Sequence, residues 1–393
     1  MKFLHLSDLH IGKHVNGFNM AECQRHALAQ VLAMITEHKV NALVLAGDIY
    51  DKTSPSEEAV ELFDWFITQV TELGVPCLGI PGNHDSAERI AYANQLLAKQ
   101  GLHLPPVFAG DVTHLTLEDE HGPVTFWLLP FLRPVDVRRF FPEAEIGNDY
   151  TAAIRTVLEA CPLSPDQRNV LVAHQFVTAG GSSPERADDE ISLGGVDNVD
   201  ASAFDAFDYV ALGHVHRPQR IGRDTVRYAG SLLKYNISEA RFAKSATLVT
   251  LGEKHPDDEA GACVTFQQLP LTPLRDLRQI KGPLAELISD QVAYAANNPD
   301  YIYAVLTVET TQIDALARIR QVYPNVMAID YDNTRTQRTL GDTAPLKPSQ
   351  DIDPQALFAE FFYSQAGKDL TDDQRSLATK LLTEALEEAG KTS

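Results

Sequence analysis

The chain has 393 residues, 44% hydrophobic and 22% charged, which is the composition of a globular protein of two or three domains. Its formal net charge of -21 excludes a protein that coats nucleic acid through a broadly basic surface, and no apolar run is long enough to span a membrane. The first ten residues contain Asp and His too early for a secretory signal, and the four scattered cysteines favour reduced thiols, so we expect a cytoplasmic protein.

Short apolar runs alternate with longer amphipathic stretches over residues 1–251. Runs typical of buried strands cover residues 2–7, 41–47, 75–80, 125–130, 169–174, 208–213, 226–231 and 246–251. Apolar residues at helical spacing predict helices over 21–39 and 56–74. This alternation predicts an α/β fold in which two sheets pack face to face and are flanked by helices.

The rest of the chain predicts three further segments after a first domain that spans residues 1–270. Residues 271–335 are expected to form a small α+β domain, with an amphipathic helix from about residue 276, strands over 301–309 and 325–332, and a helix over 312–323. Residues 336–350 are expected to form a linker, and residues 351–393 a pair of helices.

The helical pair has clear start signals and apolar faces. Asp353 precedes Pro354 at a helix start, and Thr371 and Gln374 have the spacing of a capping box. The apolar positions are Leu357, Phe358, Phe361, Phe362, Ala378, Leu381, Leu382, Ala385 and Ala389. Because two short helices have little core of their own, we expect them to dock onto a partner, with packing against the parent domain as the alternative.

Five of the predicted strands end in polar residues of one chemical kind. These residues are Asp8 and His10, Asp48 and Asp51, Asn83 with His84 and Asp85, His174, and His214 with His216. Ligands of open α/β sheets bind outside the carboxyl ends of the strands, so we expect these clusters to converge on one crevice.

The clustered side chains have the chemistry of a metal site. Carboxylates, imidazoles and one amide, without a thiolate, suit Mn, Fe or Zn. Seven of them fill two sites of about four ligands each if one carboxylate bridges, and paired metals hydrolyse phosphate esters. They are Asp8, His10, Asp48, Asn83, His174, His214 and His216.

The motifs "SDLHIG", "GDIYD", "PGNHDS", "VAHQF" and "LGHVH" resemble those of the calcineurin-like metallophosphoesterases over residues 1–216. Other stretches, among them "FLRPVDVRRF", "ISLGGVDNV" and "YAGSLLKYNISE", are similar to the nuclease-subunit family of the bacterial SbcCD complex, a relative of the double-strand-break repair nucleases. This second resemblance spans essentially the whole chain.

The resemblance implies a role for each residue of the cluster. Asp8, His10 and His216 would hold one divalent metal, Asn83, His174 and His214 the other, and Asp48 would bridge them, with Mn²⁺ as the expected metal. It implies attack on phosphorus by hydroxide between the metals, with His84 protonating the leaving group and Asp51 orienting His84 through its carboxylate.

The resemblance also implies a function and partners. It implies a homodimeric nuclease subunit that works with the ATPase subunit SbcC as an ATP-dependent double-strand exonuclease and hairpin endonuclease in DNA repair, recombination and replication. Residues 271–335 would form a cap domain for DNA, and residues 351–393 would bind SbcC. The alternatives are a small-molecule or cyclic-nucleotide phosphodiesterase, a protein phosphatase, and a scaffold without chemistry. The complete ligand set counts against the scaffold.

Basic residues near the cluster are candidates for DNA contact. Arg133, Arg138 and Arg139 lie in one loop, and Lys13 and His14 directly follow the first ligand pair. Arginine offers a two-pronged donor to phosphate. A solvated loop is an equally good interpretation of these residues.

Overall fold

A computed structural model of the chain describes residues 1–187, 197–255, 257–295, 299–308 and 314–332, and beyond them 358–359, 362, 369–372 and 374–381. The chain divides into two compact units, Met1–Leu277 and Arg278–Ser393. The predicted linker and most of the predicted helical pair lie outside the described residues.

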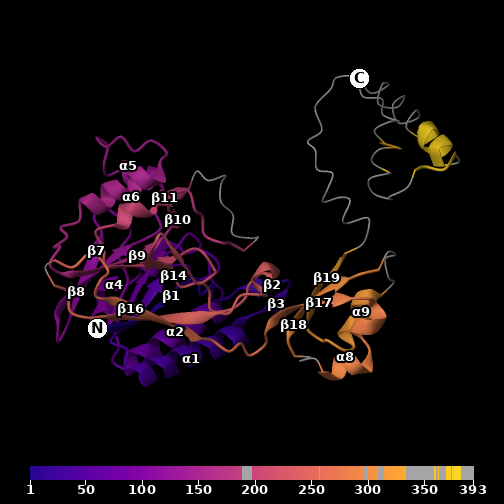
Figure 1. Cartoon of the computed structure of the whole chain (residues 1–393), viewed down its shortest axis with the longest axis horizontal. Helices are drawn as coiled ribbons and strands as arrows, with labels where there is room; N and C mark the ends of the chain where they lie inside the picture. The colour runs from indigo at the N-terminus through magenta and orange to yellow at the C-terminus, as the bar shows by residue number, and fades with distance from the viewer. Residues whose placement is uncertain are drawn as a thin grey trace. The chain divides into compact units, whose positions relative to one another are not determined.

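The first unit contains two six-stranded sheets (Figure 1). The first sheet has the order β16 (Val264–Pro270), β15 (Ser245–Leu251), β1 (Lys2–Leu6), β4 (Ala42–Ala46), β5 (Cys77–Ile80) and β6 (Leu102–His103). The second has the order β13 (Gln219–Ile221), β14 (Arg223–Tyr228), β12 (Tyr209–Gly213), β9 (Arg168–His174), β8 (Gly122–Leu129) and β7 (Thr113–Asp119). Strands β1, β4, β5 and β6 are parallel, as are β8, β9, β12 and β14, so within each sheet their carboxyl ends share an edge.

The two sheets pack face to face around a hydrophobic core. Phe3 lies at its centre, with its ring centroid 5.4 Å from that of Phe126 and 5.6 Å from that of Tyr209. Every residue of β4, β9 and β12 is buried. Strands covered on both faces need such continuous apolar runs, which is why their sequences do not alternate with polar residues.

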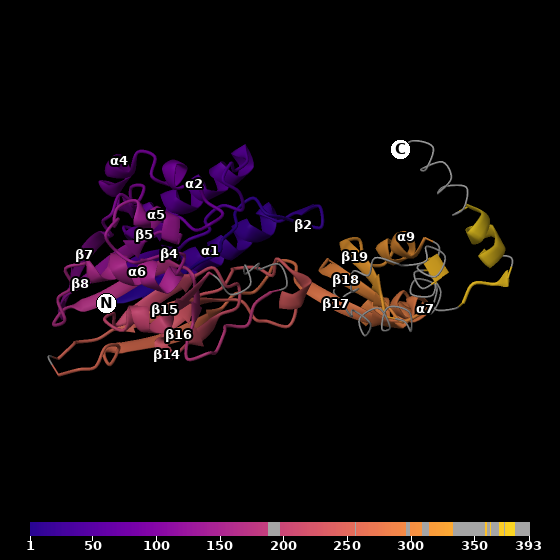
Figure 2. The same ribbon diagram turned by 90° about the horizontal axis from the view of Figure 1, so that it is seen from above.

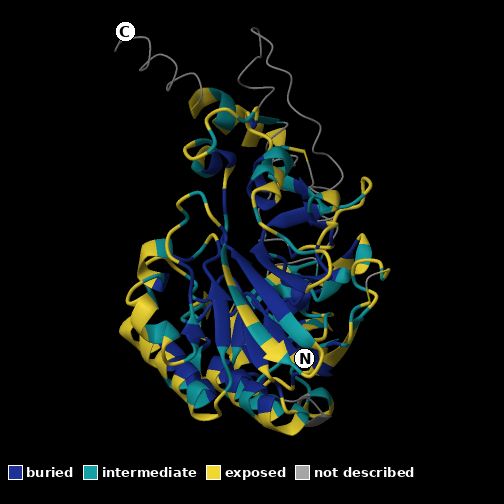
Figure 3. Cartoon of the chain, turned by 90° about the vertical axis from the view of Figure 1, so that its left-hand side faces the viewer, coloured by how far each residue is buried: buried dark blue, intermediate teal, exposed yellow. Residues whose placement is uncertain are grey.

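Helices cover the outer faces of this sandwich. Helices α1 (Ala21–His38) and α2 (Glu57–Glu72) lie side by side (Figures 1 and 2). Helix α2 begins at the N-cap Ser56, whose Oγ accepts the Ala59 N–H at 3.3 Å. On the second sheet, α5 (Pro134–Arg138) and α6 (Tyr150–Glu159) pack in one cluster with β8 and β9. The strands are mostly buried and the outward faces of the helices exposed (Figure 3). The predicted α/β two-sheet fold is confirmed.

Short elements complete the first unit. They are β2 (His14–Val15), β3 (Phe18–Asn19), α3 (Ala87–Ile90), α4 (Asn94–Ala98), β10 (Phe176–Thr178), β11 (Asn198–Asp200), η1 (Ala201–Phe204) and η2 (Ile237–Glu239). Pairs β2–β3 and β10–β11 form two small ribbons.

The second unit contains a three-stranded sheet of order β17 (Leu277–Gly282), β18 (Tyr301–Leu306) and β19 (Val326–Tyr331). Its helices are α7 (Leu284–Leu287), α8 (Asp290–Ala295) and α9 (Ala315–Arg320). The prediction of a helix from residue 276 is wrong at its start. In β17, Leu277 is buried, Gln279 is exposed and Ile280 packs against the core of this unit, so the alternation of a strand decides the local structure.

Part of the helical pair falls on described residues. Residues 374–381 are helical, and the predicted capping box is confirmed. The Thr371 N–H donates to Gln374 Oε1 at 3.0 Å, and the Gln374 N–H donates to Thr371 Oγ1 at 3.3 Å. The predicted first helix around Pro354 lies mainly outside the described residues. Among the described helices, none is long and apolar enough to cross a membrane.

Candidate metal centre

The loops that follow five parallel strands bring the predicted ligands together. Asp8 and His10 follow β1, Asp48 follows β4, Asn83 follows β5, His174 ends β9, and His214 and His216 follow β12. Nitrogen and oxygen atoms of these residues form overlapping groups in which all atoms lie within 4.8 Å of one another. The centre therefore lies where the carboxyl ends of the two sheets meet, as the sequence predicts.

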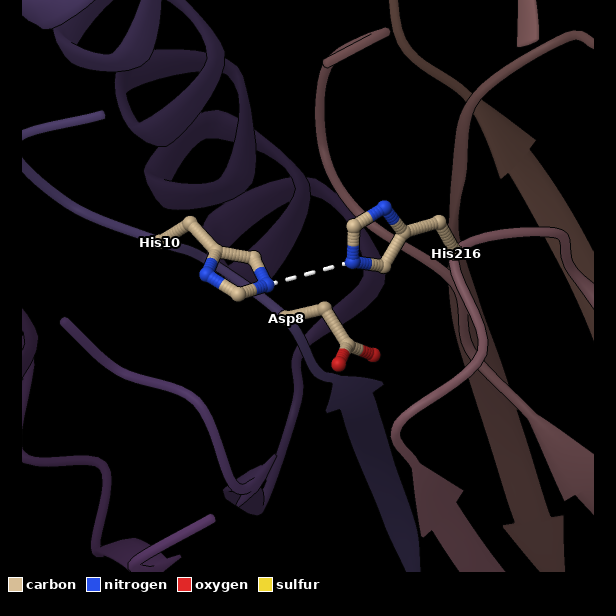
Figure 4. A group of neighbouring side chains, drawn as sticks. All are labelled: Asp8, His10 and His216. Carbon is tan, nitrogen blue, oxygen red and sulfur yellow. Dashed lines mark hydrogen bonds between the residues drawn. The ribbon is translucent and has the colours of Figure 1, made fainter. Parts of the chain in front are cut away.

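The first group consists of Asp8, His10 and His216 (Figure 4). The Nε2 atoms of the two histidines lie 3.1 Å apart, close to the Asp8 carboxylate. Behind each ring lies a carboxylate: Glu239 Oε1 is 3.2 Å from His216 Nδ1, and Asp51 Oδ1 is 3.5 Å from His10 Nδ1. These carboxylates favour Nδ1–H on both rings, so each Nε2 presents a lone pair to the other.

The second group consists of Asn83, His174 and His214. Asn83 Oδ1 lies 3.0 Å from His174 Nε2 and 2.9 Å from His214 Nδ1. His174 donates its Nδ1–H to the carbonyl oxygen of Ala46 at 2.8 Å, which leaves Nε2 as a lone-pair donor towards the site.

Asp48 lies between the two groups. Its Oδ2 atom is 3.7 Å from His10 Nε2 and 3.3 Å from His174 Nε2. Its Oδ1 atom accepts the main-chain N–H of His84 at 2.9 Å, which fixes the orientation of the carboxylate. Asp48 therefore has the position of a residue that contacts both groups.

The donor set fits divalent cations. Lone pairs that face one another at about 3 Å are repulsive unless a proton or a cation lies between them, and here two such encounters occur beside buried carboxylates. The oxygen and imidazole ligands match Mn²⁺, Fe²⁺ or Zn²⁺ and not a thiolate-selecting ion.

The pKa shifts have the signs expected of a site built for cations. Burial disfavours the charged form of His174, but the negative charges of Asp48 and Asp8 outweigh it and raise its pKa to about 9. Burial and the neighbouring His174 lower the pKa of His214 to about 4, and burial lowers that of His10. The carboxylates thus stabilise positive charge at the point between the two groups.

The backbone around the centre is strained. Asp8, His10, Asp48 and His214 all have positive φ angles, of 51°, 44°, 50° and 103°. Such conformations persist where surrounding structure imposes them, and they are common at functional sites. Gly82 allows the close approach of the two loops, because a Cβ there would lie 2.2 Å from Asp48 Oδ1.

His84 lies beside the first group, with its ring centroid 4.8 Å from that of His10. Its Nδ1–H donates to the main-chain carbonyl of Asp51 at 3.0 Å. The Asp51 carboxylate instead lies 3.0 Å from Lys13 Nζ and 3.5 Å from His10 Nδ1. The expectation that this carboxylate orients His84 is therefore corrected: the main chain of Asp51 does so, because its side chain is directed to Lys13 and His10.

The candidate DNA-contacting residues have partners within the protein. Lys13 pairs with Asp51, and Arg133 makes a two-pronged ion pair with Asp136 at 3.0 and 3.1 Å. Arg138 donates to Asn148 at 3.2 Å, Arg139 lies over the Phe140 ring, and exposed His14 contacts the Gly12 carbonyl. DNA contact by these residues stays a prediction.

Sequence reasoning missed several supporting residues. Buried Gln24 on α1 donates to the His10 carbonyl at 2.7 Å, and Glu239 lies behind His216. Both Asp85 oxygens accept main-chain N–H groups, from Ile49, Tyr50 and Gly82, so this carboxylate ties two ligand loops together. Burial raises the pKa of Asp85 to about 6. Only Asp85 stands in a recognisable motif; Gln24 and Glu239 come from segments without a pattern.

Comparison with known proteins finds two family matches along the chain. Residues 1–218 match the calcineurin-like phosphoesterase family, and residues 273–366 match the type 5 capsule protein repressor C-terminal domain. A subunit of the nuclease SbcCD from Staphylococcus epidermidis is 31% identical over 332 residues, which cover 84% of this chain and 85% of the relative.

Two solved structures have distant similarity. A phosphopantetheinyl hydrolase from Mycobacterium tuberculosis is 15% identical, covers 68% of this chain and 95% of its own, and has a TM-score of 0.36. A dimetal phosphatase from Danio rerio is 12% identical, covers 69% of this chain and 99% of its own, and has a TM-score of 0.38.

Proposed function

Because the chain belongs to the calcineurin-like phosphoesterase family, we propose that it is the nuclease subunit of an SbcCD complex, a metal-dependent DNA phosphodiesterase. The observation that carries the proposal is the paired ligand groups with Asp48 between them, in a chain that aligns over 84% of its length with a subunit of the nuclease SbcCD. The similarity extends far beyond the ligand motifs, which favours the nuclease over a small-molecule phosphodiesterase.

The proposed cofactor is a pair of Mn²⁺ ions, which when bound would polarise the phosphodiester and activate water. Asp8, His10 and His216 would hold one ion, Asn83, His174 and His214 the other, and Asp48 both. His84, held by the Asp51 carbonyl at 3.0 Å, would give a proton to the departing oxygen of the cleaved strand. Burial of the ligands limits competing water and strengthens their electrostatic interactions.

The proposed substrates are double-stranded DNA ends and hairpins, and the proposed partners are the ATPase subunit SbcC and a second copy of this chain. The net charge of -21 supports a partner that supplies DNA affinity, because the chain lacks a broadly basic composition. Residues 271–335 are proposed as the DNA cap and residues 351–393 as the segment that binds SbcC, in a cytoplasmic complex.

The proposal is tested with the purified chain and Mn²⁺. We expect cleavage of hairpin and blunt-ended duplex DNA, stimulated by SbcC and ATP, and loss of cleavage after chelation. Bis-p-nitrophenyl phosphate and cyclic nucleotides serve as comparison substrates. Turnover of cyclic nucleotides without any cleavage of DNA would favour the alternative phosphodiesterase instead.

A further inference from the structure

Both imidazoles of the first group have an anionic side chain behind them. The Nδ1–H of His216 donates to Glu239 Oε1 at 3.2 Å, and Nδ1 of His10 lies 3.5 Å from Asp51 Oδ1. In each case the carboxylate faces the ring nitrogen opposite the Nε2 that points into the centre. A carboxylate in this position fixes the tautomer and makes the imidazole a more basic ligand.

Glu239 is held firmly in its charged form and place. Its side chain is 1% exposed, and it pairs with Lys244, whose own side chain is 5% exposed. Lys244 Nζ also donates to the His216 carbonyl oxygen and to Ser231 Oγ, both at 2.8 Å. The main-chain N–H of Tyr235 donates to Glu239 Oε1 at 3.3 Å. These contacts join the lysine, the carboxylate and the histidine in one buried network.

The second group has a different support. Nδ1–H of His174 donates to the neutral carbonyl oxygen of Ala46 at 2.8 Å, so a main-chain dipole takes the place that a carboxylate has behind His216. A carbonyl dipole raises the basicity of an imidazole less than a full negative charge at similar distance does. The two ligand groups therefore differ in their electrostatic support although they share Asp48.

We infer that Glu239 is a positioning residue that, through His216, makes the group of Asp8, His10 and His216 the tighter of the two metal sites. Asp51 has the same role towards His10, from the opposite side of that site. The inference rests on the two-metal part of the proposed function, and it adds an order of occupation: the first group fills before the group of Asn83, His174 and His214.

The test is calorimetric titration of the metal-free, full-length chain with Mn²⁺. Glu239→Gln keeps the size of the side chain and removes its charge. We expect it to weaken the tighter of the two binding steps by about 10- to 100-fold and to change the weaker step less than about twofold. Asp51→Asn should weaken the same step, which keeps the test open if Glu239→Gln does not fold.

Asp208→Asn is the matched control. Asp208 is fully buried, pairs with Lys254 at 3.1 Å and accepts the Asn169 N–H at 2.8 Å, but it lies at the start of β12, opposite the ligand end. This variant should leave both binding steps unchanged. In addition, the visible absorption of Co²⁺ bound at the tight site should shift in Glu239→Gln and not in Asp208→Asn.

The outcomes separate this inference from the proposed function. If the unmodified chain fails to bind two Mn²⁺ ions, the two-metal proposal itself fails. If it binds two ions and the folded Glu239→Gln variant keeps both affinities, or loses both equally, the inference about Glu239 is overturned while the proposed function stands.

Discussion

Nδ1 of His84 lies 3.0 Å from the main-chain carbonyl oxygen of Asp51. This contact fixes the ring by a group that no side-chain substitution at position 51 removes. His84 therefore keeps its orientation independently of the Asp51 carboxylate, which faces Lys13 and His10.

His84→Ala is predicted to retain both metals and to cleave DNA about 10²- to 10⁴-fold more slowly, because leaving-group protonation is lost. The defect should shrink for p-nitrophenyl esters, whose leaving group needs little protonation. Metal content by elemental analysis and rates on both substrates provide the measurement. Loss of metal from this variant would identify His84 as a ligand instead.

Asp48→Ala is predicted to lose both metals, because its Oδ2 atom lies 3.7 Å from His10 Nε2 and 3.3 Å from His174 Nε2. Asp8→Ala is the comparison, and it should chiefly weaken one site. Mn²⁺ stoichiometry of the two purified variants is the measurement. An Asp48→Ala protein that still held two ions would exclude a bridging role.

How far the sequence predicts this centre depends on the kind of residue. Ligands such as Asp8 and His214 are readable because each directly follows an apolar strand, and parallel strands bring their carboxyl ends together. Glu239 is not readable in this way, because its contact with His216 depends on the path of the loop after β14. Likewise, the alternation in Leu277–Gly282 is only three residues deep on each face, which is too short to separate a strand from a helix start.

Gly82→Ala is predicted to impair metal binding, because a Cβ at this position would lie 2.2 Å from Asp48 Oδ1 and 2.4 Å from its main-chain nitrogen. The two ligand loops would have to separate, which displaces the shared carboxylate. Gly252→Ala is the control, since its nearest neighbour would be 3.5 Å away. Thermal unfolding and Mn²⁺ titration of both variants measure the effect; equal metal affinities would contradict it.

The ion pair of Asp119 and Arg168 is predicted to stabilise the first unit in a pH-dependent way. Arg168, whose side chain is 2% exposed, donates to both Asp119 oxygens, at 2.5 and 3.0 Å. Burial alone would raise the pKa of Asp119, but Arg168 and the Met1 amino group outweigh it and hold the pKa below its ordinary value of 3.8.

Because the folded pKa is depressed, this contribution is fully present above about pH 4 and is lost as the pH falls towards the folded pKa. Asp119→Asn should therefore lower the free energy of unfolding at neutral pH, and the difference from the unmodified chain should shrink in acid. Urea titrations between about pH 7 and pH 3 measure this. A difference that grew on acidification would have the wrong sign.

Removal of the chain from Thr343 onwards is predicted to abolish or strongly weaken binding to SbcC, while metal content and small-ester hydrolysis stay intact. The described helix at residues 374–381 is capped by Thr371 and Gln374, and its Leu377 and Leu381 are 58% and 55% exposed. Leucines four residues apart form one apolar stripe, which suits docking against a partner helix. Leu377→Glu with Leu381→Glu should reproduce the loss in the full-length chain, as measured by co-purification with SbcC. Unchanged binding in both proteins would place the SbcC contact elsewhere, because neither would then retain an intact apolar stripe on this helix.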